Sequence, residues 1–144
     1  MSTYWRFYYH IVWGTKNREP IITESRVKLI REAIAAVTVD LEPMIFAIGA
    51  MPDHVHLAVA IPPRVAVADA VQRIKGVSSH RVNEATTDPY DGFRWQPGYG
   101  AFTFGERSLA DVVSYIENQR EIHGRRSLIR PSFELPIEHA PQPR

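Results

Sequence analysis

Two histidines at the start of an apolar run have the spacing of a metal site. His54 and His56 lie in the stretch MPDHVHLAVAIP, residues 51–62. In a β-strand, residues two apart point to the same face, so the two imidazoles would project side by side. Neutral imidazole is the commonest protein ligand for transition metals. An H-x-H pair is also what two part-buried histidines bonded to the backbone would look like, so the pair alone leaves both interpretations open.

A tyrosine and a glutamine form a second pair, in the segment SYIENQ. Tyr115 and Gln119 are four residues apart, so they share one face of the helix that we expect over residues 108–123. His123 continues that face one turn further on and is interpreted only as a helix-end residue. By themselves, a packed core aromatic and a solvated helix residue would account for Tyr115 and Gln119.

Two further segments carry groups that suit nucleic acids. RIKGVSSHR (residues 73–81) would form a polar helical surface of the kind that contacts phosphates, and FRWQPGYGAF (residues 93–102) places aromatic residues and Arg where they could stack on unpaired bases. An ordinary solvated helix face and aromatics that close a core edge are the alternatives. Gly76 costs about 1 kcal/mol in a helix relative to Ala, so we expect a close approach there. The candidate DNA-binding residues are Arg73, Lys75, Ser78, Ser79, Arg81, Arg94 and Trp95.

Composition narrows the classes of protein. The chain has 144 residues, 44% of them hydrophobic, which suits one domain with a real core. Cysteine is absent, which excludes disulfides and thiolate chemistry and agrees with an expected cytoplasmic location. We find neither a signal peptide nor an apolar run of the roughly 20 residues that would span a membrane. The net charge is only +1, but 14 of the 17 basic residues are Arg, which favours bidentate phosphate contacts.

Hydrophobic periodicity predicts seven elements in the order β-α-β-β-α-β-α. The expected strands are 4–13, 44–50, 54–61 and 99–104, and the expected helices are 23–39, 65–84 and 108–123, with Thr23 and Ser108 as N-caps. This order predicts an α+β fold, the ferredoxin-like split βαβ fold with an antiparallel four-stranded sheet. Two helices would cover one face and leave the other free, and the last helix would be an addition. We expect one domain over 1–127 and a Pro-rich tail over 128–144.

Four segments in this order give the chain a family resemblance. MPDHVH, RIKGVSSHR, WQPGYG and VVSYIENQ, with the opening YYHIVWGTKNREP, resemble the single-tyrosine HUH transposases. That family comprises small insertion-sequence transposases and REP-associated tyrosine transposases. The histidine–hydrophobic–histidine motif is here His54-Val55-His56, and the resemblance covers about Tyr4 to Arg126. It implies a ferredoxin-like fold, in agreement with the element order, plus a C-terminal catalytic helix.

The resemblance also implies a chemistry. It makes Tyr115 the nucleophile, and His54, His56 and Gln119 ligands of a divalent metal, Mg²⁺ or Mn²⁺. Asp53 could orient a histidine from behind, or be only a turn residue. A phenol with a pKa near 10 is a poor nucleophile at neutral pH, and a metal on the scissile phosphate would compensate for this.

The implied function is that of a transposase, a metal-dependent single-stranded DNA endonuclease and strand transferase. It would act at hairpin-flanked sites through a 5′-phosphotyrosine intermediate, as a homodimer. The alternative is a non-catalytic single-stranded nucleic-acid-binding module, in which Tyr8 or Trp13 would stack on bases. A metal-dependent hydrolase of small molecules is less favoured, because no third His or carboxylate motif accompanies the histidine pair.

Overall fold

The computed structural model describes residues 4–119 and has the predicted α+β architecture. Its four strands are β1 (Tyr8–Gly14), β2 (Met44–Met51), β3 (His54–Ala60) and β4 (Gly100–Phe104). Its helices are α1 (Glu24–Leu41), α2 (Val67–Ala85) and α3 (Leu109–Glu117), with short 3₁₀ turns at Lys16–Arg18 and Glu106–Ser108. The strands form one antiparallel sheet in the order β2-β3-β1-β4. The ferredoxin-like prediction is thereby confirmed.

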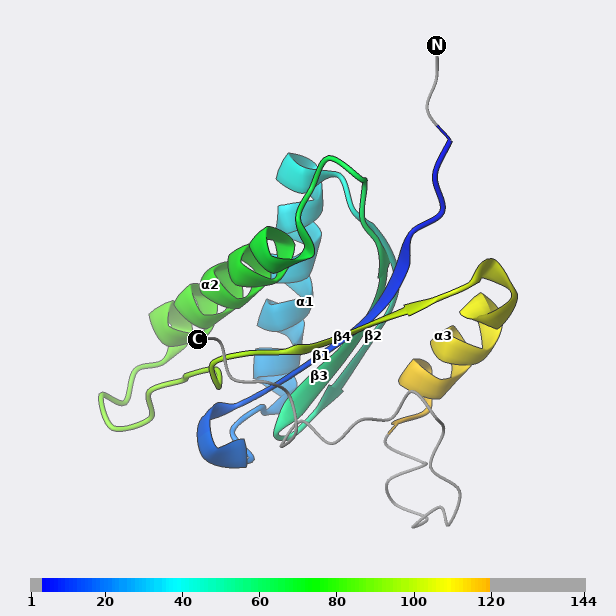
Figure 1. Cartoon of the computed structure of the whole chain (residues 1–144). Helices are drawn as coiled ribbons and strands as arrows, with labels where there is room; N and C mark the ends of the chain where they lie inside the picture. The colour runs from blue at the N-terminus through cyan, green and yellow to red at the C-terminus, as the bar shows by residue number, and fades with distance from the viewer. Residues whose placement is uncertain (1–3, 120–144) are drawn as a thin grey trace.

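The sheet is covered on both faces. Helices α1 and α2 pack side by side against one face, and α3 lies across the other (Figure 1). The prediction that the second face stays free is therefore wrong, because the added helix returns to cover part of it. Strand alternation decides which residues meet which helices. Residues such as Trp13, Val55 and Leu57 belong to the core under α1 and α2, whereas Ala47 and Ala58 pack against α3.

Helix α1 shows how the local sequence builds the larger core. The side chain of Thr23 accepts a hydrogen bond from the backbone N–H of Arg26 and caps the helix, as predicted. Ile30, Ile34 and Val37 recur at helical spacing and are almost completely buried. Glu42 ends the helix in the left-handed conformation, with φ of 57°. This layer therefore follows from capping and apolar periodicity.

Most predicted boundaries lie within two residues of the observed ones, but three predictions about the ends of elements differ in a way that matters. Strand β1 begins at Tyr8 and not at Tyr4. The Ser108 side chain makes no capping bond, because Ser108 has helical φ and ψ and continues from the preceding 3₁₀ turn. Helix α3 ends at Glu117. The part of the predicted helix over 120–123 and the tail over 128–144 lie outside the described residues. Within residues 4–119, no helix has the length and apolar character to cross a membrane.

Candidate functional site

The predicted histidine pair lies on the face of the sheet that α3 covers. His54 and His56 are both nearly buried, and their ring centroids are 4.9 Å apart with the rings at 72°. Strand β3 lies between β1 and β2, so the pair sits toward the middle of the sheet and not on its edge. The sequence-based prediction that the two rings share one face is confirmed.

The Nδ1 atom of each ring has a partner of its own. His54 Nδ1 lies 2.6 Å from Asp53 Oδ1, and His56 Nδ1 lies 2.8 Å from Nε2 of His10. A ring whose Nδ1 is engaged in this way offers its Nε2 to a ligand. The contact expected of Asp53 is therefore present, and each imidazole is held through its Nδ1 atom.

Asp53 is itself held by an arginine. Arg18 Nε and one terminal nitrogen lie 3.1 and 3.0 Å from Asp53 Oδ2. Burial alone would raise the pKa of Asp53, but the hydrogen bond and charge of His54, together with the charge of Arg18, lower it. The carboxylate is therefore ionised at neutral pH and can accept the proton of His54 Nδ1. Asn17 and Arg18 have φ of 56° and 55°, a left-handed turn that brings the guanidinium to Asp53.

His10 is a site residue that sequence reasoning missed. It is fully buried on β1, and burial lowers its pKa from 6.5 to about 4, so it is neutral at pH 7. Its register partner on β3 is Ala58, which makes His10 the diagonal neighbour of His56 on the same face. The sequence showed a histidine in the first strand, but only the register of β1 against β3 brings it to the pair.

Tyr115 reaches the histidines from α3. Its ring centroid lies 6.0 Å from that of His56 and 6.3 Å from that of His10, edge-on to both. The ring also packs with Ala58 and Ile116 in a small second core. Tyr115 is thus both a packed aromatic and a neighbour of the histidines. The interpretation as a core residue and the interpretation as a site residue are therefore compatible.

Gln119 lies two residues beyond the end of α3. The prediction of one continuous helix through Tyr115 and Gln119 is wrong, because Asn118, with φ of −100° and ψ of 13°, leaves the helical conformation. Gln119 is nonetheless only 1% exposed, and neither its Oε1 nor its Nε2 has a hydrogen-bond partner within residues 4–119. A buried amide needs hydrogen-bond partners, and a bound ligand could supply one.

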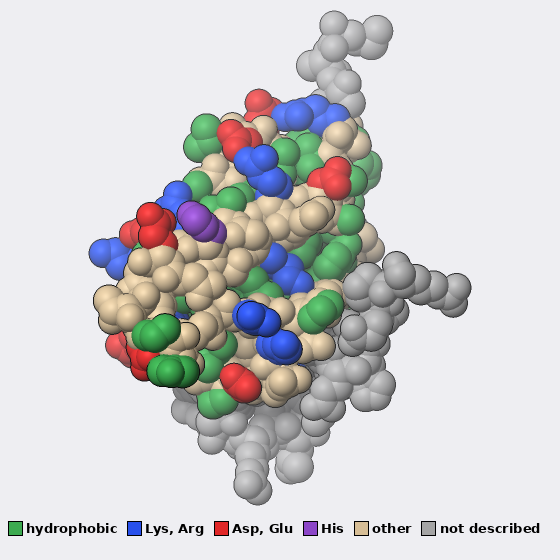
Figure 2. Space-filling model, turned by 90° about the vertical axis from the view of Figure 1, so that its left-hand side faces the viewer, with side chains coloured by type: hydrophobic (Ala, Val, Ile, Leu, Met, Phe, Trp, Pro, Cys, Tyr) green, Lys and Arg blue, Asp and Glu red, His purple; other side chains and the backbone are tan. Residues whose placement is uncertain are grey.

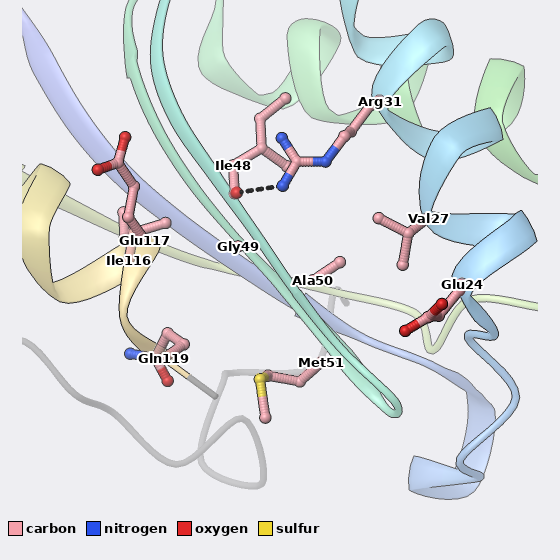
Figure 3. A pocket seen from close by; sticks show the side chains of 10 residues that line it. All are labelled: Glu24, Val27, Arg31, Ile48, Gly49, Ala50, Met51, Ile116, Glu117 and Gln119. Atoms are coloured by element: carbon pink, nitrogen blue, oxygen red, sulfur yellow. Dashed lines mark hydrogen bonds between the residues drawn. The ribbon is translucent and has the colours of Figure 1, made fainter. Parts of the chain in front are cut away.

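Gln119 lines a cavity of about 340 Å³ (Figure 3). The cavity lies between α1 and the end of α3, and Gly49 and Met51 of β2 line it together with Gln119. Gly49 and Met51 are the register partners of His56 and His54. Gln119 therefore lies near β2, the strand next to the one that carries the two imidazoles.

Gly49 sets how closely α3 approaches the sheet. A Cβ atom at this position would lie 2.5 Å from the backbone oxygen of Ile116, closer than real contacts allow. Ile116 follows Tyr115 directly, so the space left by the glycine decides where the tyrosine sits. Sequence reasoning did not single out Gly49, because the close approach involves a helix 67 residues further along the chain.

The three predicted ligand side chains carry donor atoms of the kinds that bind a divalent cation. Two imidazole nitrogens and one amide oxygen suit Mn²⁺ or a similar ion, and they leave coordination positions open for phosphate oxygens. No cluster of three or more His, Cys, Asp or Glu that could hold a metal exists in the described part of the chain. His10 does not add a third imidazole ligand, because its Nε2 faces Nδ1 of His56. An amide would therefore have to complete the protein's share of the coordination.

The two predicted nucleic-acid segments meet on the other side of the molecule. A groove of about 800 Å³ runs between α2 and residues 93–99, and its lining includes Lys75, Ser79, Arg94 and Trp95 but no acidic residue. Lys and Arg side chains occupy the middle of this side of the molecule (Figure 2). The groove belongs to the layer of α1 and α2, opposite the histidine pair.

Several of these candidates have structural partners. Ser78 is fully buried, donates to the backbone oxygen of Ile74 and accepts from Trp95 Nε1, so it holds the loop to α2 and cannot reach DNA. Lys75 Nζ donates to the backbone oxygens of Gln96 and Gly98, and burial lowers its pKa.

The remaining candidates differ in exposure. Arg73 is paired with Asp40, Arg81 is half-buried and Arg94 is exposed. A Cβ at Gly76 would meet open space, so no described residue makes the close approach expected there. Arg94 is therefore the candidate best placed to meet a ligand from solvent.

Comparisons with known proteins cover most of the chain. A family model described as IS200-like transposase matches residues 3–119, which include every candidate site residue. The ISDra2 transposase TnpA of Deinococcus radiodurans is 27% identical over 117 residues, which span 78% of this chain and 84% of that protein. The transposase for insertion sequence element IS200 of Salmonella typhimurium is 27% identical over 123 residues, with coverage of 83% and 80%.

Solved structures show the same fold. A Deinococcus radiodurans protein solved as a candidate transposase has a TM-score of 0.64 and 28% identity, and the match covers 83% of this chain and 95% of that one. A REP-associated tyrosine transposase bound to a REP hairpin has a TM-score of 0.65 and 22% identity, with coverage of 86% and 75%. Sequence and structure comparisons therefore converge on one group of proteins.

Proposed function

The chain belongs to the IS200-like transposase family, and on that premise we propose that it cleaves and rejoins single-stranded DNA through a phosphotyrosine on Tyr115. Membership of this family implies a DNA-cleaving enzyme. The observation that carries the proposal is the convergence of Tyr115 with the histidine pair: a helix on one side of the sheet brings its tyrosine ring 6.0 Å from the His56 ring.

We assign three side chains to a divalent ion, Mg²⁺ or Mn²⁺. Nε2 of His54, Nε2 of His56 and the amide oxygen of Gln119 would hold it. Asp53 and His10 engage the opposite ring nitrogens and so support this assignment. When bound, such an ion polarises the scissile phosphate and offsets the charge that develops in the transition state.

The proposed reaction conserves the phosphodiester bond energy. The phenolic oxygen of Tyr115 attacks the phosphorus and loses its proton, the P–O3′ bond breaks, and the 3′ oxygen leaves as a hydroxyl. The product is a 5′-phosphotyrosine and a free 3′-OH. Attack of a 3′-OH on the tyrosyl phosphate reverses these steps and joins two DNA ends, so no ATP is needed. Packing of the Tyr115 ring against Ala58 and Ile116 supports the role by orienting the phenol.

The substrate we propose is single-stranded DNA with a hairpin, bound by a homodimer. The REP-associated relative of the same fold was solved with a REP hairpin. In this chain, Arg94, Ser79 and Trp95 line the groove beside α2 and could contact phosphates and bases. Because that groove and the histidine pair lie on opposite layers, DNA would contact the protein at two separate places.

The non-catalytic binding module is less well supported. It relied on Tyr8 and Trp13 as stacking platforms on an open sheet. Both are buried, Trp13 in the larger core and Tyr8 against Phe46 and Phe104 under the α3 face. A base could not stack on either ring without opening the fold.

An adduct assay tests the proposal. The full chain is incubated with labelled single-stranded DNA hairpins from the flanks of its own gene, with Mn²⁺ or EDTA, and resolved on a denaturing gel. We expect a Mn²⁺-dependent adduct that Tyr115→Phe abolishes. Tyr8→Phe is the matched control, because Tyr8 and Tyr115 have the same 6% exposure, but Tyr8 packs against phenylalanines. An adduct that persists in Tyr115→Phe would contradict the assignment, and metal-independent hairpin binding without cleavage would favour the binding module.

A further inference from the structure

We propose that His10 is a positioning residue for the metal site, which sets the tautomer and orientation of His56 by accepting a hydrogen bond from its Nδ1–H. His10 itself would not touch metal or DNA. The proposal rests on the proposed function in one respect, namely that His56 offers Nε2 to the ion. It adds a residue that neither the family resemblance nor the motif analysis assigned.

The geometry of the two rings carries the inference. His10 Nε2 and His56 Nδ1 are 2.8 Å apart, and the rings stack with centroids 5.1 Å apart at 23°. Both side chains are buried, at 0% and 3% exposure, so water does not compete strongly for this bond. Register explains the contact: His10 pairs with Ala58, two residues along β3 from His56, and diagonal neighbours on one sheet face are within reach of imidazole rings.

Proton counting fixes the direction of the bond. A neutral imidazole carries one N–H and one acceptor nitrogen. If Nε2 of His56 gives its lone pair to a metal, the proton of His56 is on Nδ1. His10 must then accept at Nε2 and carry its own proton on Nδ1. The reverse arrangement would place the His56 proton on Nε2 and block metal binding there.

The two histidines are therefore oriented by different chemistries. His54 is held by a carboxylate, which Arg18 supports, whereas His56 is held by a buried neutral imidazole. A carboxylate increases the basicity of the ring that it contacts, and an imidazole acceptor does so less. Such a pair would give the ion one stronger and one weaker nitrogen ligand.

The first test reads the tautomers directly in the metal-free full chain. Long-range ¹H–¹⁵N correlation spectra of the ¹⁵N-histidine-labelled protein at pH 8 distinguish protonated from unprotonated ring nitrogens. We expect both His56 and His10 to carry their protons on Nδ1. A proton on Nε2 of His56 would overturn the proposal. Because this measurement involves neither metal nor DNA, it succeeds or fails independently of the proposed transposase chemistry.

The second test compares two variants of His10. His10→Phe keeps a ring but removes the acceptor, whereas His10→Gln can place an amide oxygen close to the former Nε2 position. We expect His10→Phe to weaken Mn²⁺ binding, measured by calorimetry, about 10- to 100-fold, the usual effect of losing such a partner. His10→Gln should restore most of that loss. His80→Phe, on the exposed surface of α2, is the control and should bind as the wild type does.

The results of the two tests together decide whether His10 positions His56. Wild-type affinity in a folded His10→Phe protein would overturn the proposal, as would equal losses in the Phe and Gln variants, which would indicate a purely packing role. If His10→Phe does not fold, the tautomer spectrum of the wild type still decides. Absence of Mn²⁺ binding in the wild type itself would contradict the proposed metal ligands, and the spectrum would remain the test of His10.

Discussion

The two faces of the sheet carry side chains of different chemistry. On the face under α1 and α2, side chains such as Ile11, Trp13 and Leu57 form one apolar core. On the face under α3, the strands present His10 and His56, and the small residues Ala47 and Ala58 pack against the helix. The difference indicates that one layer supplies most of the stability and the other most of the chemistry.

The same strands serve both layers. Every residue of β3 is buried, so its imidazoles cannot rely on water and must be satisfied by protein groups or a ligand. Asp53 and His10 meet this need for one nitrogen of each ring. A substitution in an apolar core lowers stability in proportion to the contact area that is lost. A polar site of this kind depends instead on individual hydrogen bonds. Substitutions on the two faces should therefore fail in different ways.

The largest expected contrast is between Tyr115→Phe and Ile30→Ala. Removing one hydroxyl from the α3 face should abolish the covalent adduct and change the free energy of unfolding by no more than about 1 kcal/mol, because the ring packing is kept. Ile30 of α1 is fully buried in the core between the helix and the sheet, so truncating it should cost about 2–5 kcal/mol and leave adduct formation in the folded fraction unchanged. Urea denaturation and the adduct gel measure the two quantities. Loss of the adduct in a well-folded Ile30→Ala protein would break the comparison.

Substitutions of two glycines, one beside α3 and one on α2, extend the comparison between the two faces. Gly49→Ala would push a methyl group against the Ile116 backbone oxygen and displace α3, so we expect adduct formation to fall by at least about tenfold, as small misplacements of catalytic groups do. Gly76→Ala on α2 meets open space and should raise stability by up to about 1 kcal/mol through helix propensity. Initial rates of adduct formation and thermal unfolding of both variants provide the check. Equal rates in Gly49→Ala and wild type would show that α3 adapts.

The next contrast concerns the carboxylate behind His54. Asp53→Asn removes the charge that accepts the His54 proton and pairs with Arg18, so Mn²⁺ affinity should drop about 10- to 100-fold. Asp88→Asn is the matched control, because an amide oxygen can still accept from the Tyr90 N–H in that loop. Calorimetric titration with Mn²⁺ compares the three proteins. An unchanged affinity in Asp53→Asn would mean that Asp53 is only a turn residue.

The layer built from apolar periodicity could be predicted from the sequence, and so could the histidine pair. Thr23 as a cap, the helical spacing along α1 and the period of two in the strands are local signals. The shared face of His54 and His56 follows from strand geometry alone. These features involve residues close together in the chain, so their physics does not depend on how the strands pair.

The parts that could not be predicted depend on contacts between distant segments. His10 and His56 are 46 residues apart in the sequence, and only the register of β1 against β3 brings them together. Ser78 looked like a phosphate ligand but is buried by the indole of Trp95, 17 residues further on. The end of α3 at Glu117 coincides with non-helical φ and ψ at Asn118, and sequence reasoning found no signal for it.

The smallest expected effect tests whether the apolar layer also has a role in DNA binding. Arg94 is exposed and lines the groove beside α2, so Arg94→Ala should weaken hairpin binding several-fold. The slope of log K against log salt concentration should also fall by about the value of one phosphate contact. Arg64→Ala, an exposed arginine paired with Glu42 outside the groove lining, is the control. Fluorescence anisotropy across a salt series measures both. Equal salt slopes in the two variants would confine DNA binding to the face of the histidine pair, and a lower slope in Arg94→Ala alone would extend function to both sides of the sheet.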